Sequence, residues 1–262
     1  MRLLLIGDIV GKPGRKYLKK YLADFRAEHN IDLVIANAEN AAGGAGLTEK
    51  SFKEVQQAGV DLLTGGNHIW DQKDIFNFID NEQTLIRPAN YPPGTTPGRG
   101  FVVVETKGQK LKVAVLNLLG RVFMEQVDCP FRIADEVINQ LREKVEIIIV
   151  DFHAEATSEK QAMGWYLNGR VSAVVGTHSH VQTADQRILS GKTAYITDVG
   201  MVGLYDAILG VDKDGPINRF LTRLPCKLNV SDAGKTVFNA VLINLNERSG
   251  TADSIDRIFA VD

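Results

Sequence analysis

The sequence predicts an α/β protein, and two observations support this prediction. Short apolar runs rich in β-branched residues recur along most of the 262-residue chain, and segments with the periodicity of amphipathic helices lie between most of them. Continuous apolar runs are typical of strands that are buried on both faces of a sheet. A chain in which such strands alternate with helices belongs to the α/β class.

The individual elements follow from these patterns in chain order. Strands are predicted at Leu3–Ile6, Leu33–Ala36, Asp61–Thr64, Val113–Asn117, Glu146–Asp151 and Ser172–Gly176. Helices are predicted at Tyr17–Glu28, Lys50–Gln57, Ile75–Ile79 and Ile133–Lys144. The C-terminal part changes character, because Ser-Asp-Ala-Gly and Glu-Arg-Ser-Gly turns separate further apolar runs. Antiparallel strands are therefore expected at Cys226–Val230, Thr236–Asn244 and Ser254–Ala260.

We expect a single domain covering residues 1–262. Pro88–Gly100 contains four prolines and three glycines, but the alternating pattern resumes after it, so this segment is interpreted as a surface loop and not as a linker. Cys129 and Cys226 are too few and too far apart for a thiolate metal site. Both are expected to be reduced, with a single disulfide as the alternative. No apolar stretch approaches the roughly 20 residues that span a bilayer, so a soluble, cytoplasmic protein without a membrane partner is expected.

The charge balance limits the classes of partner. The chain has 30 basic and 32 acidic side chains and a net charge of −2. It therefore lacks the overall positive field with which proteins bind duplex nucleic acid through its phosphates. Extended duplex nucleic acid is not an expected partner. The sequence does not determine the oligomeric state, and a homo-oligomer stays one of the alternatives.

Polar side chains follow five of the predicted strands, at the point where each strand ends. They are Asp8, Glu39, Asn40, Asn67, His68, His153, His178 and His180. In open α/β sheets, ligands bind beyond the carboxyl ends of the strands, so these side chains should converge on one site. In extended backbone, His178 and His180 would project to the same side, which suits two metal ions side by side. His29 lies near the end of a predicted helix without such neighbours, and it is assigned no role.

Each of these segments also has an ordinary structural interpretation. Asp8 alone is typical of a turn or a helix cap. Gly7–Pro13 is one residue short of a Walker A loop and has a proline where the loop needs a hydroxyl, so a P-loop is rejected. Small residues after Asn40 leave room for a bulky group near the backbone, which favours a carboxylate at Glu39 that bridges two cations. The glycine-rich run Ile196–Gly203 either lines the site or forms a tight connection.

The residue types indicate the kind of metal and the reaction. Carboxylates, amide oxygens and imidazoles without thiolates suit manganese, iron or a similar ion better than structural zinc. Seven candidate ligands are too many for one ion. A dinuclear centre with one shared carboxylate clamps the attacking and leaving oxygens of an in-line displacement at phosphorus. The sequence therefore predicts metal-assisted hydrolysis of a phosphoester.

Taken together, these motifs resemble those of the calcineurin-like metallophosphoesterases. The matching segments are Gly7-Asp8, Glu39-Asn40, Gly66-Asn67-His68, His153 and Gly176-Thr177-His178-Ser179-His180, in the same order along nearly the whole chain. Most members have a histidine two residues after the first aspartate and an aspartate as the bridging ligand, whereas this chain has Val10 and Glu39. With Gly65–Asp71 and Asp151–Lys160, these departures make it resemble the bacterial YmdB-type phosphodiesterases, also described as 2′,3′-cyclic-nucleotide 2′-phosphodiesterases.

The resemblance implies a four-layer α/β/β/α sandwich and a role for each motif. One ion would be held by Asp8, Glu39, Asn40 and His180, and the other by Glu39, Asn67, His153 and His178. The ions would be divalent or mixed-valence, with iron or manganese favoured. The substrate would be a small nucleotide phosphodiester, with 2′,3′-cyclic nucleotides preferred and 3′,5′-cyclic nucleotides as a second class. A hydroxide shared by the ions would attack phosphorus in line, and His68 would act as the general acid.

Three other functions fit part of the sequence pattern. A metal-dependent amidohydrolase on a β/α barrel also uses a His-x-His pair, but that pair is expected at the first strand, where this chain has only Asp8. A metal-binding regulatory protein that acts through RNA or protein partners stays open, although the complete set of inferred ligands favours catalysis. The preference for a diester over a monoester rests on the resemblance, so a phosphomonoesterase also stays an alternative.

Overall fold

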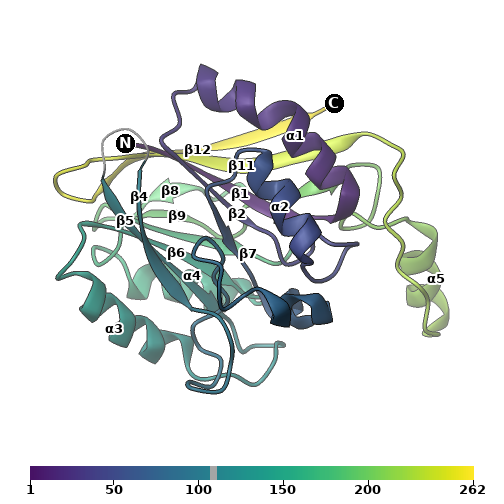
Figure 1. Ribbon diagram of the computed structural model, residues 1–262, viewed down its shortest axis with the longest axis horizontal. Coiled ribbons are helices and arrows are strands. Elements are labelled where there is room, and N and C mark those ends of the chain that lie inside the picture. Colours follow the sequence, from purple (N-terminus) through teal and green to yellow (C-terminus); the bar gives the residue numbers. More distant parts are fainter. Residues whose placement is uncertain (107–110) are drawn as a thin grey trace.

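The computed structural model, which describes residues 1–106 and 111–262, contains two six-stranded sheets (Figure 1). The first sheet has the order β12-β11-β10-β1-β2-β3, and the second has the order β4-β5-β6-β7-β9-β8. The strands of the first sheet are β1 (Arg2–Ile9), β2 (Leu33–Asn37), β3 (Leu62–Thr64), β10 (Met201–Leu204), β11 (Thr236–Leu245) and β12 (Ala252–Val261). Those of the second are β4 (Phe101–Glu105), β5 (Lys112–Leu119), β6 (Ile147–His153), β7 (Ala173–Thr177), β8 (Arg187–Ile188) and β9 (Ala194–Ile196).

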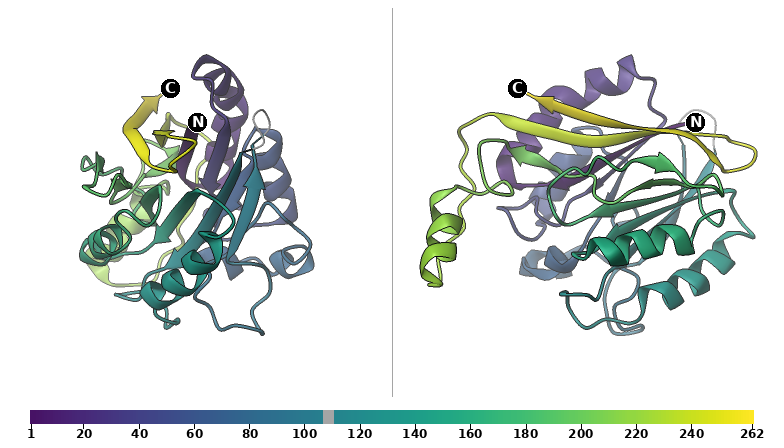
Figure 2. Two further views of the ribbon diagram at one scale, coloured as in Figure 1. Left: turned by 90° about the vertical axis from the view of Figure 1, so that its left-hand side faces the viewer. Right: turned by 180° about the vertical axis from the view of Figure 1, so that it is seen from behind.

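Helices cover the outer face of each sheet, so the molecule has the four layers that the resemblance implied. The helical segments are α1 (Gly11–Glu28), α2 (Glu49–Gln57), the 3-10 turns η1 (Asn67–Trp70) and η2 (Lys73–Asn77), α3 (Pro130–Leu141), α4 (Thr157–Tyr166) and α5 (Asp214–Thr222). α1 and α2 pack on the first sheet, and α3 and α4 pack on the second. Figure 2 shows α1 and the α3–α4 pair on opposite sides of the sheets, while α5 stands off from both layers.

The alternation of side chains along each strand builds three separate apolar layers. Leu3 and Leu5 of β1 contact residues of the second sheet, whereas Leu4 and Ile6 pack under α1. β6 behaves in the same way, because its odd-numbered isoleucines face the first sheet and Ile148 faces α3 and α4. Both faces of these central strands are therefore buried, which is the physical reason for their continuous apolar runs. The predicted α/β class is confirmed.

The structure corrects three of the predicted elements. Cys226–Val230 is not a strand but an irregular segment, because it pairs with no strand in the described part of the chain and Val230 packs instead against Val10 and Met201. Ile75–Ile79 contributes only the 3-10 turn η2. The first helix begins at Gly11 and not at Tyr17, since a proline is compatible with the first turn of a helix.

The sequence periodicity does not indicate several short elements. They are β4, β8, β9, β10, α4 and α5. The strands among them have two to five residues, which is too short for a period to be recognised. Cys129 and Cys226 are free thiols, as expected. Among the described helices, none combines the length and apolar character needed to cross a bilayer.

Candidate metal centre

The carboxyl ends of strands from both sheets meet at one edge of the sandwich. Asp8 lies on β1, Glu39 and Asn40 follow β2, Asn67 follows β3, His153 ends β6, and His178 and His180 follow β7. The structure brings all seven candidate ligands to this edge. Val10 is buried in a small apolar cluster with Met201 and Val237, so it offers no donor at the position where the resemblance to the metallophosphoesterases would place a histidine.

One group of donor atoms surrounds Nε2 of His153. This nitrogen lies 3.0 Å from Oε1 of Glu39, 3.1 Å from Oδ1 of Asn67 and 3.1 Å from Nδ1 of His178. Donors about 2.1 Å from a common ion are separated by about 3.0–3.4 Å at tetrahedral or octahedral angles. Glu39, His153 and His178 have donor atoms within 4.8 Å of one another, as a metal site requires. The group therefore has the spacing of a single-ion site.

A second group lies beside the first and includes Asp8, Asn40 and His180. Nε2 of His180 is 3.2 Å from Nδ2 of Asn40 and 3.8 Å from Oδ1 of Asp8. The Asn40 amide also lies 3.4 Å from Oε1 of Glu39, which connects the two groups. Turning this amide by 180° would present its oxygen at the same place. The second group is wider than the first, but it too consists of oxygen and imidazole donors.

Asp8 supplies the observation that best fits a bound cation. Its carboxylate is fully buried, and Oδ1 has no hydrogen-bond partner among the described residues. The other oxygen, Oδ2, accepts a hydrogen bond from the backbone N–H of His178 at 3.1 Å. Buried carboxylate oxygens are nearly always satisfied by a donor or a cation. The residues present therefore fit a metal ion next to Oδ1.

Hydrogen bonds to the outer nitrogen of each imidazole fix which nitrogen faces the centre. Nδ1 of His153 lies 2.9 Å from the Thr177 hydroxyl, and Nδ1 of His180 lies 3.0 Å from the carbonyl oxygen of Leu209. Nε2 of His178 lies 3.0 Å from Glu155. An acceptor at one ring nitrogen places the proton there and leaves the lone pair of the other nitrogen free for a metal. All three rings are oriented in this way.

The electrostatics of the metal-free site are dominated by its two buried carboxylates. Burial raises the pKa of Asp8. Burial also acts to raise the pKa of Glu39, but the adjacent His153 outweighs it and lowers that pKa to about 2. Burial acts to lower the pKa of His153, but Glu39 and Asp8 raise it to about 9. Burial and the neighbouring His153 lower the pKa of His178 to about 3. The two buried carboxylates thus favour a positive charge next to them. Without a cation, the protonated ring of His153 provides this charge.

Residues outside the predicted set hold the ligands in place. The Thr177 hydroxyl donates to Oδ1 of the buried Asp151 at 2.7 Å, which continues the contact from His153. Asp198 accepts the backbone N–H of Ser179 at 3.0 Å and forms a fully buried ion pair with Lys160 at 2.6 Å. Asp198 falls in the glycine-rich run that the sequence had singled out. Lys160 ends the segment Asp151–Lys160 that contributed to the resemblance, but nothing in the sequence indicated that its ammonium group is buried, because lysines are ordinarily exposed.

The His178–His180 segment differs from the extended geometry that its spacing suggested. β7 ends at Thr177, and both histidines have positive φ angles of 105° and 63°. The segment is therefore a strained turn, and the two rings present different nitrogens to the centre, Nδ1 of His178 and Nε2 of His180. Positive φ is uncommon for residues other than glycine and is retained where the surrounding structure holds it. The hydrogen bonds of Asp8 and Asp198 to this turn provide that restraint.

His68 occupies a different position from the other histidines. Its backbone N–H donates to Oε2 of Glu39 at 2.8 Å, and its Nδ1 lies 2.8 Å from the carboxylate of Asp71. The side chain is 42% exposed and lines a cleft of about 750 Å³. The remaining ring nitrogen, Nε2, is therefore available to a molecule in the cleft.

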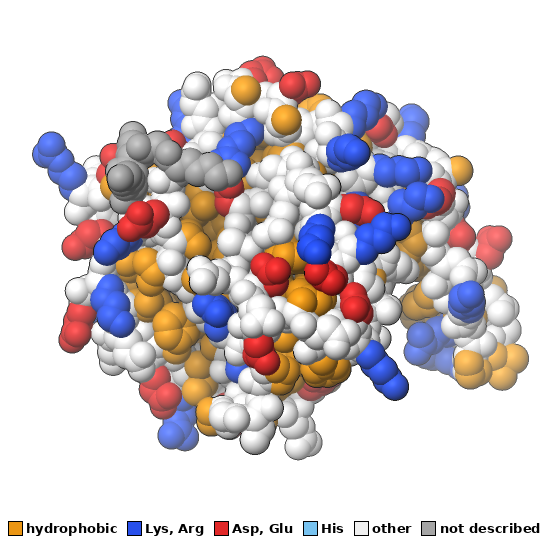
Figure 3. Space-filling model, in the orientation of Figure 1, with side chains coloured by type: hydrophobic (Ala, Val, Ile, Leu, Met, Phe, Trp, Pro, Cys, Tyr) orange, Lys and Arg blue, Asp and Glu red, His pale blue; other side chains and the backbone are white. Residues whose placement is uncertain are grey.

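The cleft lies between the proposed metal ligands and α5. Glu39, Asn40, His178 and His180 line one side, and residues of α5 line the other. Figure 3 shows α5 standing apart from the main body with a hollow between them. The volume of the cleft lies within the range of about 300–1,000 Å³ that is typical of small-ligand sites.

Comparisons with known proteins agree with this architecture. A family model described as "YmdB-like protein" matches residues 4–258. The chain is 51% identical over 262 residues to a 2′,3′-cyclic-nucleotide 2′-phosphodiesterase of Bacillus subtilis, with 100% of this chain and 98% of that protein covered.

Two solved structures are similar over the whole chain. A hypothetical protein from Thermus thermophilus is 42% identical, with a TM-score of 0.92 and 100% of both chains covered. A protein described as a novel phosphatase from Mycoplasma pneumoniae is 34% identical, with a TM-score of 0.92 and coverage of 100% of this chain and 93% of that one. Sequence motifs, fold and full-length similarity agree, and the chain belongs to the YmdB-like family.

Proposed function

We propose that the protein is a phosphodiesterase that binds two divalent or mixed-valence metal ions, iron or manganese, and hydrolyses 2′,3′-cyclic nucleotides, with 3′,5′-cyclic nucleotides as a second substrate class. The observation that carries the metal dependence is the pair of adjacent oxygen and imidazole donor groups, the second of which includes the buried, unpartnered Oδ1 of Asp8. Support for the reaction comes from the relatives, of which one is named as a 2′,3′-cyclic-nucleotide 2′-phosphodiesterase and another is described as a phosphatase.

The two groups of donors correspond to two ion sites. In this proposal one ion is held by Asp8, Glu39, Asn40 and His180, and the other by Glu39, Asn67, His153 and His178. Glu39 belongs to both sites, since its Oε1 lies near both His153 and the Asn40 amide. When bound, the two cations would supply positive charge that favours the ionisation of water and offsets negative charge on the phosphoryl group.

His68 is the proposed proton donor to the leaving oxygen. An alkoxide is a poor leaving group, so a positioned imidazolium lowers the barrier by giving a proton in the transition state. The contact of Nδ1 with Asp71 directs Nε2 towards the cleft. The backbone contact of His68 with Glu39 keeps the imidazole beside the metal site without making it a ligand.

Metal analysis joined to a substrate panel tests this function. Purified protein, loaded in turn with manganese and iron, is expected to hydrolyse a 2′,3′-cyclic nucleotide and bis(p-nitrophenyl) phosphate. Asp8→Ala and Asn67→Ala should lose activity and metal together. His29→Ala is the matched control, because His29 lies at the C-terminus of α1, outside the site.

The panel also includes a 3′,5′-cyclic nucleotide and a 3′-mononucleotide. Turnover of the monoester alone would replace the proposed diesterase with a phosphomonoesterase. Equal inactivity of wild type and variants with every metal would overturn the enzymatic proposal and favour a regulatory protein that binds RNA or a protein partner.

A further inference from the structure

The helix α5 is the part of the cleft that the proposed chemistry does not use. Along the chain, α5 lies between the loop that follows β10 and the irregular Cys226–Val230 segment. In space, it stands away from the sandwich. Pro216, Arg219, Phe220 and Arg223 from this helix and its C-cap line the same cleft as the proposed metal ligands. A substrate whose phosphate lies at the metal centre would therefore extend towards α5.

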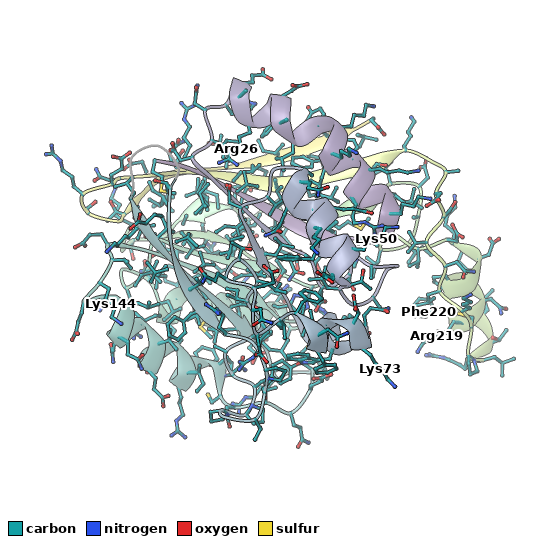
Figure 4. All side chains as sticks on the ribbon, in the orientation of Figure 1. Arg26, Lys50, Lys73, Lys144, Arg219 and Phe220 are labelled. Carbon is teal, nitrogen blue, oxygen red and sulfur yellow. The ribbon has the colours of Figure 1, made fainter. Side chains whose placement is uncertain are left out.

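The residues of α5 and its C-cap that line the cleft form one wall of it, and their side chains are unusual for a surface helix. Phe220 is 73% exposed, although aromatic rings are normally buried. Arg219 and Arg223 form no ion pair or side-chain hydrogen bond with any residue in 1–106 or 111–262. In Figure 4 the side chains of Arg219 and Phe220 extend from the side of α5 that faces the body of the protein. An exposed ring and two unpaired guanidinium groups thus line the cleft beside the proposed phosphate site.

Contacts at the base of α5 connect this wall to the metal centre. The carbonyl oxygen of Leu209 accepts a hydrogen bond from Nδ1 of His180, and the loop that contains Leu209 leads directly into α5. On the other side of the helix, the Cys226 thiol lies 3.1 Å from the carbonyl oxygen of Gly215, and the Asp212 N–H donates to the Asn229 carbonyl. The helix is therefore anchored at a fixed place relative to a proposed ligand.

We propose that α5 forms the nucleoside end of the substrate site, in which Phe220 stacks on the base while Arg219 and Arg223 contact polar atoms of the base and ribose. This inference rests on the proposed function and names the part of the substrate that gives selectivity. Bases stack well on aromatic rings, and guanidinium groups combine stacking with hydrogen bonding. Ile208, Leu209 and Leu228 line the same cleft, which is largely apolar and therefore suits a flat base better than a second phosphate.

Two substrates that share the reacting group test the proposal. A 2′,3′-cyclic nucleotide and glycerol 1,2-cyclic phosphate both contain a five-membered cyclic phosphodiester, but only the nucleotide has a base. Loss of one base stack corresponds to about 1–3 kcal/mol, so Phe220→Ala should raise the KM for the nucleotide about 5- to 150-fold. Arg219→Ala should raise it in the same direction. Both variants should keep the wild-type metal content and the wild-type kcat/KM for glycerol 1,2-cyclic phosphate.

Matched controls come from the same helix. Leu221 is 80% exposed and next to Phe220 but does not line the cleft, and Lys213 is an exposed cation at the N-cap. Leu221→Ala and Lys213→Ala should leave both KM values unchanged. An unchanged nucleotide KM in Phe220→Ala would overturn the proposal, and so would an equal increase in Leu221→Ala. An equal loss with both substrates in Arg219→Ala would assign that arginine to the phosphoryl group instead.

A binding measurement separates this inference from the proposed reaction. The fluorescence anisotropy of 1,N6-ethenoadenosine, which has a base but no phosphate, reports binding to the purified, metal-loaded protein without turnover. Binding by wild type and Leu221→Ala but not by Phe220→Ala supports the nucleoside site even if no cyclic nucleotide is hydrolysed. Binding that does not change in Phe220→Ala overturns it even if the phosphodiesterase activity is confirmed.

Discussion

Lys160→Met tests the buried ion pair that holds the turn between His178 and His180. Lys160 and Asp198 are 2% and 1% exposed, and their charged atoms are 2.6 Å apart. Removing one partner of a buried pair typically costs about 3–5 kcal/mol, because the other charge stays buried and unpaired. The N–H groups of Ser179 and Gly200 still donate to Asp198, so we expect a cost near the lower end, about 3 kcal/mol.

This cost is measurable as a change in thermal stability. For a chain of 262 residues, an unfolding entropy of about 2.1 cal/mol/K per residue converts 3 kcal/mol into a decrease in Tm of about 5 °C. Calorimetry of the metal-free protein measures this change, and elemental analysis of the loaded protein measures how many ions it retains. We expect the metal content to fall as well, because Asp198 restrains the backbone between His178 and His180.

Two further variants show whether the ion pair is the cause. Lys20→Met removes an exposed pair with Asp262, whose atoms are 3.4 Å apart, and should change the free energy of unfolding by less than about 1 kcal/mol. The double variant Lys160→Met with Asp198→Asn removes the unpaired charge and should recover part of the lost stability. A Tm for Lys160→Met that equals that of Lys20→Met would refute the reasoning, as would a double variant that is less stable than the single one.

Three other predictions concern the site and its surroundings. His68→Ala should lower kcat about 10²- to 10⁴-fold with wild-type metal content; metal loss would make His68 a ligand, and unchanged turnover would remove it from the mechanism. Gly66→Ala should abolish metal binding, because its Cβ would lie 2.4 Å from Nε2 of His153, whereas Gly43→Ala, which meets nothing within 4 Å, should retain the metal in the same elemental analysis. Burial raises the pKa of Tyr195 to about 12 from 10.0, so its contribution to stability is complete below pH 10.0 and is lost as the pH rises through about 12. Tyr195→Phe should therefore reduce the fall of the urea midpoint over that pH range; an identical fall in both proteins would contradict this.

Local patterns were sufficient where a feature depends on neighbouring residues in the chain. The runs around Leu3–Ile6 and Glu146–Asp151 became central strands, because burial on both faces demands continuous apolar side chains. The polar residues at the strand ends could also be located from the sequence, because the carboxyl ends of parallel strands meet at one edge of the sheet. The segment Cys226–Val230 shows the limit, because Val230 packs against side chains distant in the sequence and not against a neighbouring strand.

The sequence by itself determined the α/β class, the family and the candidate ligands, because each is encoded in short segments whose spacing can be read along the chain. Only the tertiary structure decided which atoms meet. The hydrogen bond from His178 to Asp8 joins residues 170 positions apart, and the pair of Lys160 with Asp198 joins α4 to the loop between β9 and β10. The nitrogen that each imidazole turns to the centre and the place of α5 above the cleft depend on such distant contacts, which no local pattern contains.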